Sequence, residues 1–118
     1  MKLIAIFAVA VLLASPAWAD LPAARVPSTN LSGTITTTGT FQSIQAQNNT
    51  RLGCTIQNNS TSNPMYLYYG SCGGASTSAS LYLAPHQAVG CSITNNFVVN
   101  DQLCIAGTSG DHFFANFQ

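Results

Sequence analysis

Four cysteines are the residues of this chain whose spacing says most about possible chemistry, because it distinguishes a metal site from disulfides. They are Cys54, Cys72, Cys91 and Cys104. No two of them stand in a Cys-x-x-Cys pair, and neither His86 nor His112 lies at a familiar ligand interval from them. The spacing therefore argues against a metal site, and no cofactor is expected. In an oxidising compartment the four would instead form two disulfides, for which three connectivities exist.

The strand pattern favours one of these connectivities. Cys54 and Cys91 each fall in a strand-like run, on a face that we expect to point inward. Cys72 follows a strand, and Cys104 is expected to point away from the apolar residues on either side of it. We favour Cys54–Cys91 with Cys72–Cys104, while the other two pairings remain open. Each bridge would contribute about 4 kcal/mol in the chain-entropy model, comparable with the whole stability of a small domain.

Acid–base catalysis has few candidates in this chain. A small hydrolase would use His86 or His112 together with Asp101 or Asp111, since catalysis of this kind needs titratable groups held near a substrate. Each of the four stands in a turn or at the start of a strand, where a structural role suffices. The chain also lacks the G-x-S-x-G motif and the lysine of a phosphate loop. We assign no catalytic residue and expect a protein that is not an enzyme.

The first 19 residues read as a cleavable signal peptide. Lys2 supplies positive charge, residues 3–14 form an apolar run, and Ala17-Trp18-Ala19 is the small-x-small pattern of a cleavage site. The apolar run is shorter than the roughly 20 residues needed to span a bilayer, so no stable membrane insertion is expected. Cleavage after Ala19 would deliver the chain to the periplasm, the cell surface or the medium.

The remaining chain carries almost no charge. From Asp20 onward the charged residues are Arg25, Arg51 and three aspartates, and Ser, Thr, Asn and Gln make up 40 of 99 residues. A protein without a basic patch lacks the electrostatic footprint of nucleic-acid binding. A neutral polar surface instead suits self-assembly, a larger surface or particle assembly, or contact with glycans.

The organisation along the chain predicts a single all-β domain. Residues 20–33 carry prolines and no periodicity, and read as an extended N-terminal arm. Residues 34–118 hold short apolar or β-branched runs separated by Gly, Asn, Ser and Pro turns, with a Gly- and Ser-rich loop at 70–80. The predicted strands lie at 41–47, 52–58, 65–69, 81–83, 88–93, 97–99, 103–106 and 112–117, and the β-branched residues of the Thr-rich stretch 34–38 also favour a pleated surface. About seven or eight short antiparallel strands predict a small β-sandwich stapled by disulfides, either a jelly roll or immunoglobulin-like.

Three tyrosines form the candidate contact surface. Tyr66 and Tyr68 share one face of a strand, opposite Leu67, and Tyr82 lies between two leucines of another strand. If the leucines point inward, the tyrosines form an outer patch. Tyrosine suits contact surfaces and stacking on sugars because it combines apolar area with a polar tip. The alternative is that the rings merely fill half-buried sheet positions.

Several short motifs together resemble a known kind of module. They are Arg51-x-Gly53-Cys54-x-Ile56-x-Asn58-x-Ser60, then 65–70, Leu81-x-Leu83-Ala84-Pro85, 101–107 and a closing aromatic strand. Over about residues 34–118 this pattern resembles the small β-sandwich modules of tailed-bacteriophage and prophage virion-associated proteins, such as head-decoration and fibre proteins. The resemblance implies a repeated structural or host-contact role. The expected function is an exported structural or binding protein, with the hydrolase, a periplasmic enzyme inhibitor and a carbohydrate-binding module as alternatives.

Overall fold

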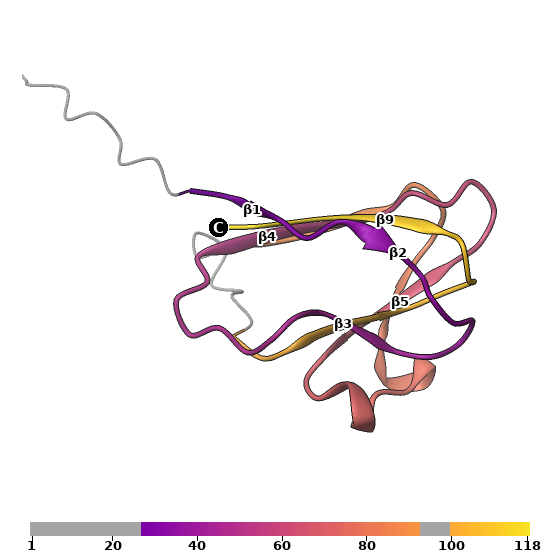
Figure 1. Ribbon diagram of the computed structural model, residues 1–118, viewed down its shortest axis with the longest axis horizontal. Helices are drawn as coiled ribbons and strands as arrows, with labels where there is room; N and C mark the ends of the chain where they lie inside the picture. Colours follow the sequence, from indigo (N-terminus) through magenta and orange to yellow (C-terminus); the bar gives the residue numbers. More distant parts are fainter. Residues whose placement is uncertain (1–26, 93–99) are drawn as a thin grey trace, which may run out of the picture.

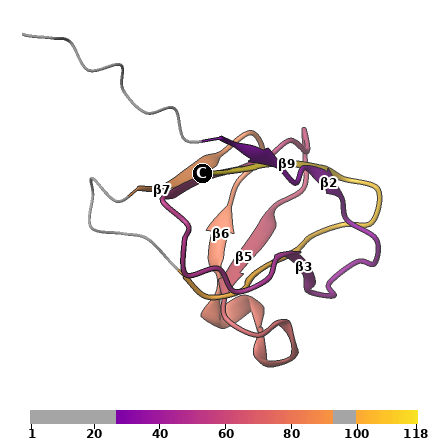
Figure 2. The ribbon, with the colours of Figure 1, turned by 60° about the vertical axis from the view of Figure 1, so that its left-hand side comes forward.

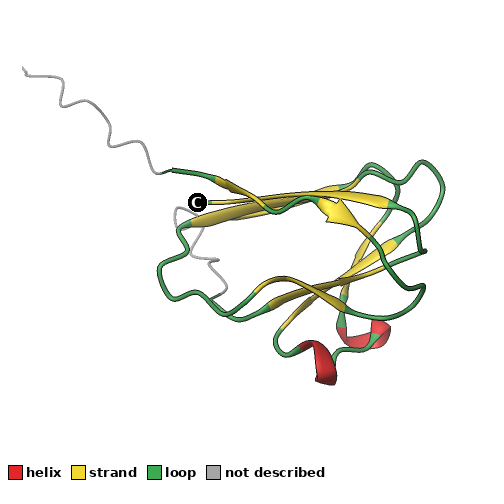
Figure 3. Ribbon diagram, viewed as in Figure 1, coloured by secondary structure: helices red, strands yellow, loops and turns green. Residues whose placement is uncertain are grey.

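The computed structural model describes residues 27–92 and 100–118, which form two antiparallel sheets (Figures 1 and 3). The predicted signal peptide, residues 20–26 of the predicted arm and the predicted strand at 97–99 lie outside the described residues. In chain order the elements are β1 (Thr29–Asn30), β2 (Gly33–Thr34), β3 (Gln42–Gln45), β4 (Gly53–Asn58), β5 (Met65–Tyr69), the 3-10 turns η1 (Cys72–Gly74) and η2 (Thr77–Ala79), β6 (Leu81–Leu83), β7 (Ala88–Ser92), β8 (Leu103–Ala106) and β9 (His112–Phe117). The predicted all-β sandwich of short strands is confirmed.

The strand pairings are nested, and this nesting defines the topology. β5 pairs with β6, β4 with β7, β3 with β8, and β2 with β9, all antiparallel. The result is one sheet in the order β1-β9-β4-β7, with β2 also on β9, and a second in the order β3-β8-β5-β6. We call them sheet A and sheet B; Figure 2 shows β5, β6 and β3 below β7, β9 and β2. A double ribbon folded in this way is a jelly roll, one of the two sandwich types predicted.

Residues 29–34 form one edge of sheet A. Thr29 lies opposite Phe117 and Thr34 opposite His112, so β1 and β2 follow β9 from end to end. Between them the Leu31 N–H donates to the Ala115 carbonyl at 2.8 Å. This part of the predicted arm is therefore extended and already joined to the sheet.

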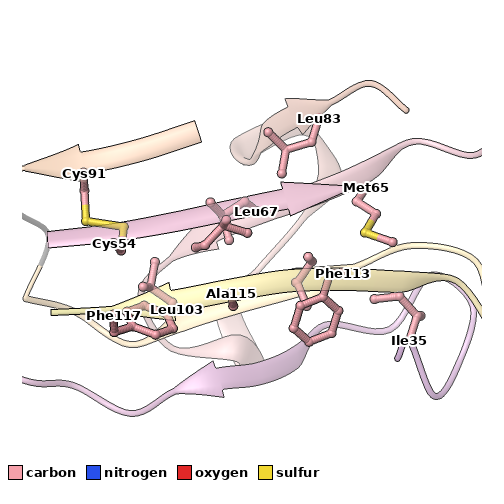
Figure 4. Close-up of a cluster of buried hydrophobic side chains, with 12 residues drawn as sticks. Ile35, Cys54, Met65, Leu67, Leu83, Cys91, Leu103, Phe113, Ala115 and Phe117 are labelled. Atoms are coloured by element: carbon pink, nitrogen blue, oxygen red, sulfur yellow. A yellow bond between two sulfur atoms is a disulfide. The ribbon is translucent and has the colours of Figure 1, made fainter. Parts of the chain in front are cut away.

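The core lies between the inner faces of the two sheets (Figure 4). Because strand residues alternate between faces, every second residue of β4, β5, β8 and β9 points inward. The largest fully buried apolar side chains are Ile35, Ile56, Met65, Leu67, Leu83, Leu103 and Ile105. Burying each of these contributes about 1.5–3 kcal/mol. Figure 4 shows the Cys54–Cys91 disulfide at one end of this cluster and Met65 with Ile35 at the other.

Most predicted faces are confirmed, but two leucines are not where the alternation placed them. Leu52 is 40% exposed because β4 begins only at Gly53. Leu81 pairs with Leu67 and shares its inward side, yet it is 42% exposed because β6 is the edge strand of sheet B. Alternation predicts the side of a sheet, but it does not predict which strand lies at the edge.

The Thr-rich stretch is the other correction. Only Thr34 of residues 34–38 belongs to a strand, and the chain then turns toward β3. The Thr40 N–H donates to the Thr37 carbonyl at 3.2 Å, and Gly39 adopts a φ of 71°. A left-handed residue favours glycine, so Gly39 ends the β-branched run in a turn despite its strand propensity.

A buried asparagine closes the turn between β4 and β5. The Asn58 amide is fully buried and donates to the carbonyls of Asn63, at 2.9 Å, and Leu83, at 3.0 Å. Its oxygen accepts the Ser60 N–H at 2.9 Å, and the Ser60 hydroxyl accepts the Asn63 N–H at 3.0 Å. These bonds satisfy the buried polar groups and join the turn to β6 of sheet B.

A buried arginine connects several strands at the other end of β4 from Asn58. Arg51 is only 3% exposed, and its Nε donates to Gln45 Oε1 at 2.8 Å while Nη1 donates to the Asp101 carbonyl at 3.1 Å. Its guanidinium lies 5.4 Å from the centre of the Phe117 ring. Arg51 therefore connects the ends of β3 and β9 with the start of β8, which lies in the other sheet from β9.

Candidate contact surface

The two disulfides occupy different sides of the structure. Cys54 lies opposite Cys91 on adjacent strands of sheet A, with a Cα–Cα distance of 4.9 Å, and both are buried in the core. Cys72 of η1 is bonded to Cys104 of β8, with a Cα–Cα distance of 5.6 Å. Cys104 points outward, because its neighbours in β8 belong to the core. The favoured pairing is the one in the structure, and the second bridge fastens the 70–80 loop to β8 of sheet B. Figure 1 shows this loop, with its two 3-10 turns, on the side of sheet B away from sheet A.

Aromatic rings gather on this outer face. Tyr66 of β5 lies directly opposite Tyr82 of β6, and their rings meet edge to face with centroids 5.8 Å apart. The Tyr68 ring meets Phe41 in the same manner at 6.2 Å. Tyr82 is 52% exposed, while Tyr66 and Tyr68 are half-buried. We call these four residues the aromatic face; the structure places all three predicted tyrosines on it.

A shallow groove lies beside Tyr66. It has a volume of about 190 Å³, and its lining includes Thr38, Tyr66, Thr77, Ala106, Gly107 and Thr108. Ala106 is fully buried and lies opposite Tyr66 in the register of β5 and β8. Thr77 belongs to η2, in the loop that the Cys72–Cys104 disulfide fastens down. The groove is therefore walled partly by the sheet and partly by the tethered loop, and none of its lining residues is charged.

The outer face of sheet A has a different character. A wider depression of about 420 Å³ is lined by Gly53, Thr55, Gly90, Asn116 and Gln118, among others. Thr55 lies opposite Gly90, and Gly53 and Gly90 present no side chain to the depression. Its lining is mainly amide, hydroxyl and backbone, with no aromatic ring.

The predicted acid–base residues are distributed over two ends of the sandwich. Asp101 lies at the Phe117 end of β9, where its carbonyl accepts from Arg51. His112 begins β9, roughly 17 Å away at about 3.4 Å per residue, and its Nδ1 is 2.9 Å from the Thr34 hydroxyl. Within residues 27–92 and 100–118, no hydrogen bond joins a histidine ring to an aspartate carboxylate.

His86 and Asp111 stand in turns. The His86 carbonyl accepts the Gln57 side-chain amide at 3.3 Å, and its own backbone adopts a φ of 61°. The Asp111 N–H donates to the Thr108 carbonyl at 3.1 Å, and its Oδ2 is buried without a hydrogen-bond partner. Backbone geometry thus accounts for the position of both residues.

Two residues that interact electrostatically, Arg51 and Tyr69, have shifted pKa values. Burial lowers the pKa of Arg51, an effect opposed by the negative charge of Asp101. Burial also raises the pKa of Tyr69, opposed by the Arg51 charge. Tyr69 packs against the core, on the opposite side of β5 from Tyr68, so both shifts bear on stability.

The structure adds residues that the sequence did not single out. Phe41 joins the aromatic face across β3 and β8, and Thr38, Thr77 and Thr108 come together from three separate loops. Only the pairing of the strands brings these positions together.

Among the described residues no group of three or more His, Cys, Asp or Glu side chains is placed to hold a metal ion. No helix in residues 27–92 or 100–118 has the length and hydropathy needed to cross a bilayer.

Comparison with family models, with curated proteins and with solved structures finds no match to this chain. The function is therefore argued from the surface itself, since a jelly roll hosts many unrelated activities.

Proposed function

We propose that this chain is an exported, non-enzymatic binding protein that acts by contact at a cell or particle surface, through its aromatic face. The observation that carries the proposal is the gathering of Phe41, Tyr66, Tyr68 and Tyr82 on the outer face of sheet B. Tyrosine is enriched at the centres of protein contacts because it offers a rigid apolar ring and a polar tip. Tyr82, 52% exposed on an edge strand, is the most accessible of them.

Export is part of the same proposal. It is supported by the signal-peptide pattern of residues 1–19 and by two disulfides, which persist in oxidising compartments. The near absence of charge fits contact with a neutral surface rather than with nucleic acid. Decoration of a particle, as the resemblance to virion-associated modules implies, is one form of this contact.

Fractionation of producing cells tests the proposal. Wild type and Tyr82→Ser are expressed from the full chain, and the share recovered with envelope or particles is compared with the share free in the medium. Leu52→Ser is the control, because Leu52 is 40% exposed but lies outside the aromatic face. We expect wild type and Leu52→Ser to be retained, with a mature mass starting at Asp20, and Tyr82→Ser to be released at least tenfold more. Equal retention of all three would contradict the proposal.

A further inference from the structure

We propose that the groove beside Tyr66 binds one pyranose ring of a neutral glycan. This inference rests on the proposed function, because it names what the aromatic face recognises. The groove is the part of that face where an aromatic ring lies beside several threonines.

The size of the groove fits a single ring. A cavity of about 150 Å³ is large enough to hold benzene, whereas sites for drug-sized ligands span about 300–1,000 Å³. The groove beside Tyr66 has about 190 Å³ and is open to solvent along one side. It therefore suits one six-membered ring within a longer chain whose neighbouring units lie over Tyr82 and the adjacent loop.

The chemistry of the walls fits a sugar ring better than an aliphatic chain. A pyranose has apolar C–H faces edged by hydroxyl groups, and the groove is lined by Tyr66 together with Thr77 and Thr108, which carry an aromatic ring and two hydroxyls. Neither of these hydroxyls has a hydrogen-bond partner within the described part of the chain. An aliphatic ligand would cover them unpaired, at a cost of about 1–3 kcal/mol for each fully buried group.

The absence of charged residues in the groove favours a neutral ligand. None of the residues that line the groove is charged, and the whole chain has three basic and three acidic side chains. A uronic acid or a sulfated sugar would lose hydration in the groove without gaining an opposite charge. Gly39 and Gly107 also line the groove, and the Gly39 N–H donates to the Gly107 carbonyl at 2.9 Å, which joins two of its walls.

The 70–80 loop supplies one wall, and the Cys72–Cys104 disulfide holds it in place. Without the bridge, Thr77 would depend on the local hydrogen bonds of η2, such as that from the Ser80 N–H to the Thr77 carbonyl at 3.4 Å. The tether thus preorganises the groove and lowers the entropic cost of binding.

The test is a titration of the purified, disulfide-intact exported protein with oligosaccharides, followed by amide NMR. The neutral probes are hexasaccharides of β-1,4-glucose, α-1,4-glucose, β-1,4-N-acetylglucosamine and β-1,4-mannose, and the charged probe is polygalacturonate. We expect at least one neutral series to shift the amides of Thr38, Thr77 and Gly107, with a Kd on the order of 1 mM for so small a site.

Threonine-to-valine variants locate the site without changing its shape. Thr77→Val and Thr108→Val each remove one hydroxyl and should weaken binding about fivefold, as expected for one hydrogen bond. Thr55→Val, on the outer face of sheet A, is the matched control and should leave the affinity unchanged.

Four results would overturn the inference: no neutral series binding, shifts confined to the depression on sheet A, polygalacturonate binding equally well, or valine variants binding as wild type does. If Tyr82→Ser is still released from the envelope in any of these cases, the contact surface stands and its ligand is another partner. If the sugar binds but Tyr82→Ser remains envelope-bound, the proposed surface contact fails instead.

Discussion

The two outer faces of this sandwich rest on similar backbones and present different chemistry to solvent. Sheet A exposes Thr55, Asn116 and two glycines around a wide polar depression. Sheet B carries a cluster of four aromatic rings and a loop fastened by the Cys72–Cys104 disulfide. The inner faces are alike, since both are apolar and fully buried. The comparison shows that the two sheets share one core, while the aromatic rings gather on a single outer surface, where we propose that recognition takes place.

The largest expected effect separates the two disulfides. Both close loops of similar length, with sequence separations of 37 and 32 residues, so each contributes about 4 kcal/mol in the chain-entropy model. Cys54 and Cys91 both belong to the core, whereas Cys104 is buried outside it and Cys72 is half-buried, so Cys54→Ala with Cys91→Ala should cost more than Cys72→Ala with Cys104→Ala. Urea unfolding of both double variants measures the difference. A larger loss of unfolding free energy for the Cys72–Cys104 pair would mean that the tethered loop contributes more to stability than the core bridge does.

The next effect tests whether buried polar groups on the inner side stabilise the fold. Asn58→Ala removes two donated hydrogen bonds and one accepted bond, and should lower the free energy of unfolding by about 3 kcal/mol. Asn59→Ala is the neighbouring control; its side chain is exposed, and the change should stay within about 0.5 kcal/mol. Urea denaturation of the two variants measures the free energy of unfolding of each. Equal losses in the two would contradict the stabilising role of Asn58.

A third comparison sets one aromatic from each outer face against the other. Tyr66 and Phe114 are both half-buried and lie on the outer sides of sheets B and A. Replacing either by serine should cost about 1 kcal/mol of stability, since similar apolar area is lost. Only Tyr66→Ser should reduce retention on envelope or particles, measured by the same fractionation. Loss of retention in Phe114→Ser alone would move the contact surface to sheet A.

A smaller effect is expected at the His86 turn. His86 has a φ of 61°, a conformation that costs a non-glycine residue about 1 kcal/mol. His86→Gly should therefore raise the thermal midpoint slightly, whereas His86→Ala should not. A stabilised His86→Gly variant that keeps its surface retention would mark this histidine as a turn residue. A loss of retention would instead assign it to the contact.

The smallest effect is expected at alkaline pH, from Tyr69, which packs against the core and is not part of the aromatic face. Burial raises the pKa of Tyr69 above its ordinary value of 10.0. A group whose pKa is higher in the folded state contributes its full stability below the unfolded pKa and loses it as pH rises through the folded value. Stability should therefore fall above about pH 10, and Tyr69→Phe should flatten that decline. An unchanged slope in Tyr69→Phe would assign the decline to other groups.

Much of the fold follows from local pattern. The runs 65–69, 81–83, 103–106 and 112–117 match the observed strands, because they are short, rich in apolar and aromatic residues, and bounded by turn residues. Cys104 points away from the core as expected, which places it within reach of Cys72 in the 70–80 loop.

What local pattern does not predict is which strand lies at an edge and which loops meet. Leu81 is exposed because β6 has a strand on one side only, and that depends on the whole sheet order. Phe41 reaches Tyr68 across an intervening strand, and three distant threonines meet at one groove. These contacts join residues that are far apart in the sequence, so they cannot be predicted from any short stretch of it.

Footprinting of the native product tests the central claim most directly. The chain recovered on envelope or particles, and the same chain purified free, are exposed to hydroxyl radicals, and oxidation is measured at Tyr82 and Leu52. With exposed fractions of 52% and 40%, both should react in the free protein. The account predicts that Tyr82 is protected in the bound protein while Leu52 stays reactive. Undiminished oxidation of Tyr82 in the bound protein would contradict it.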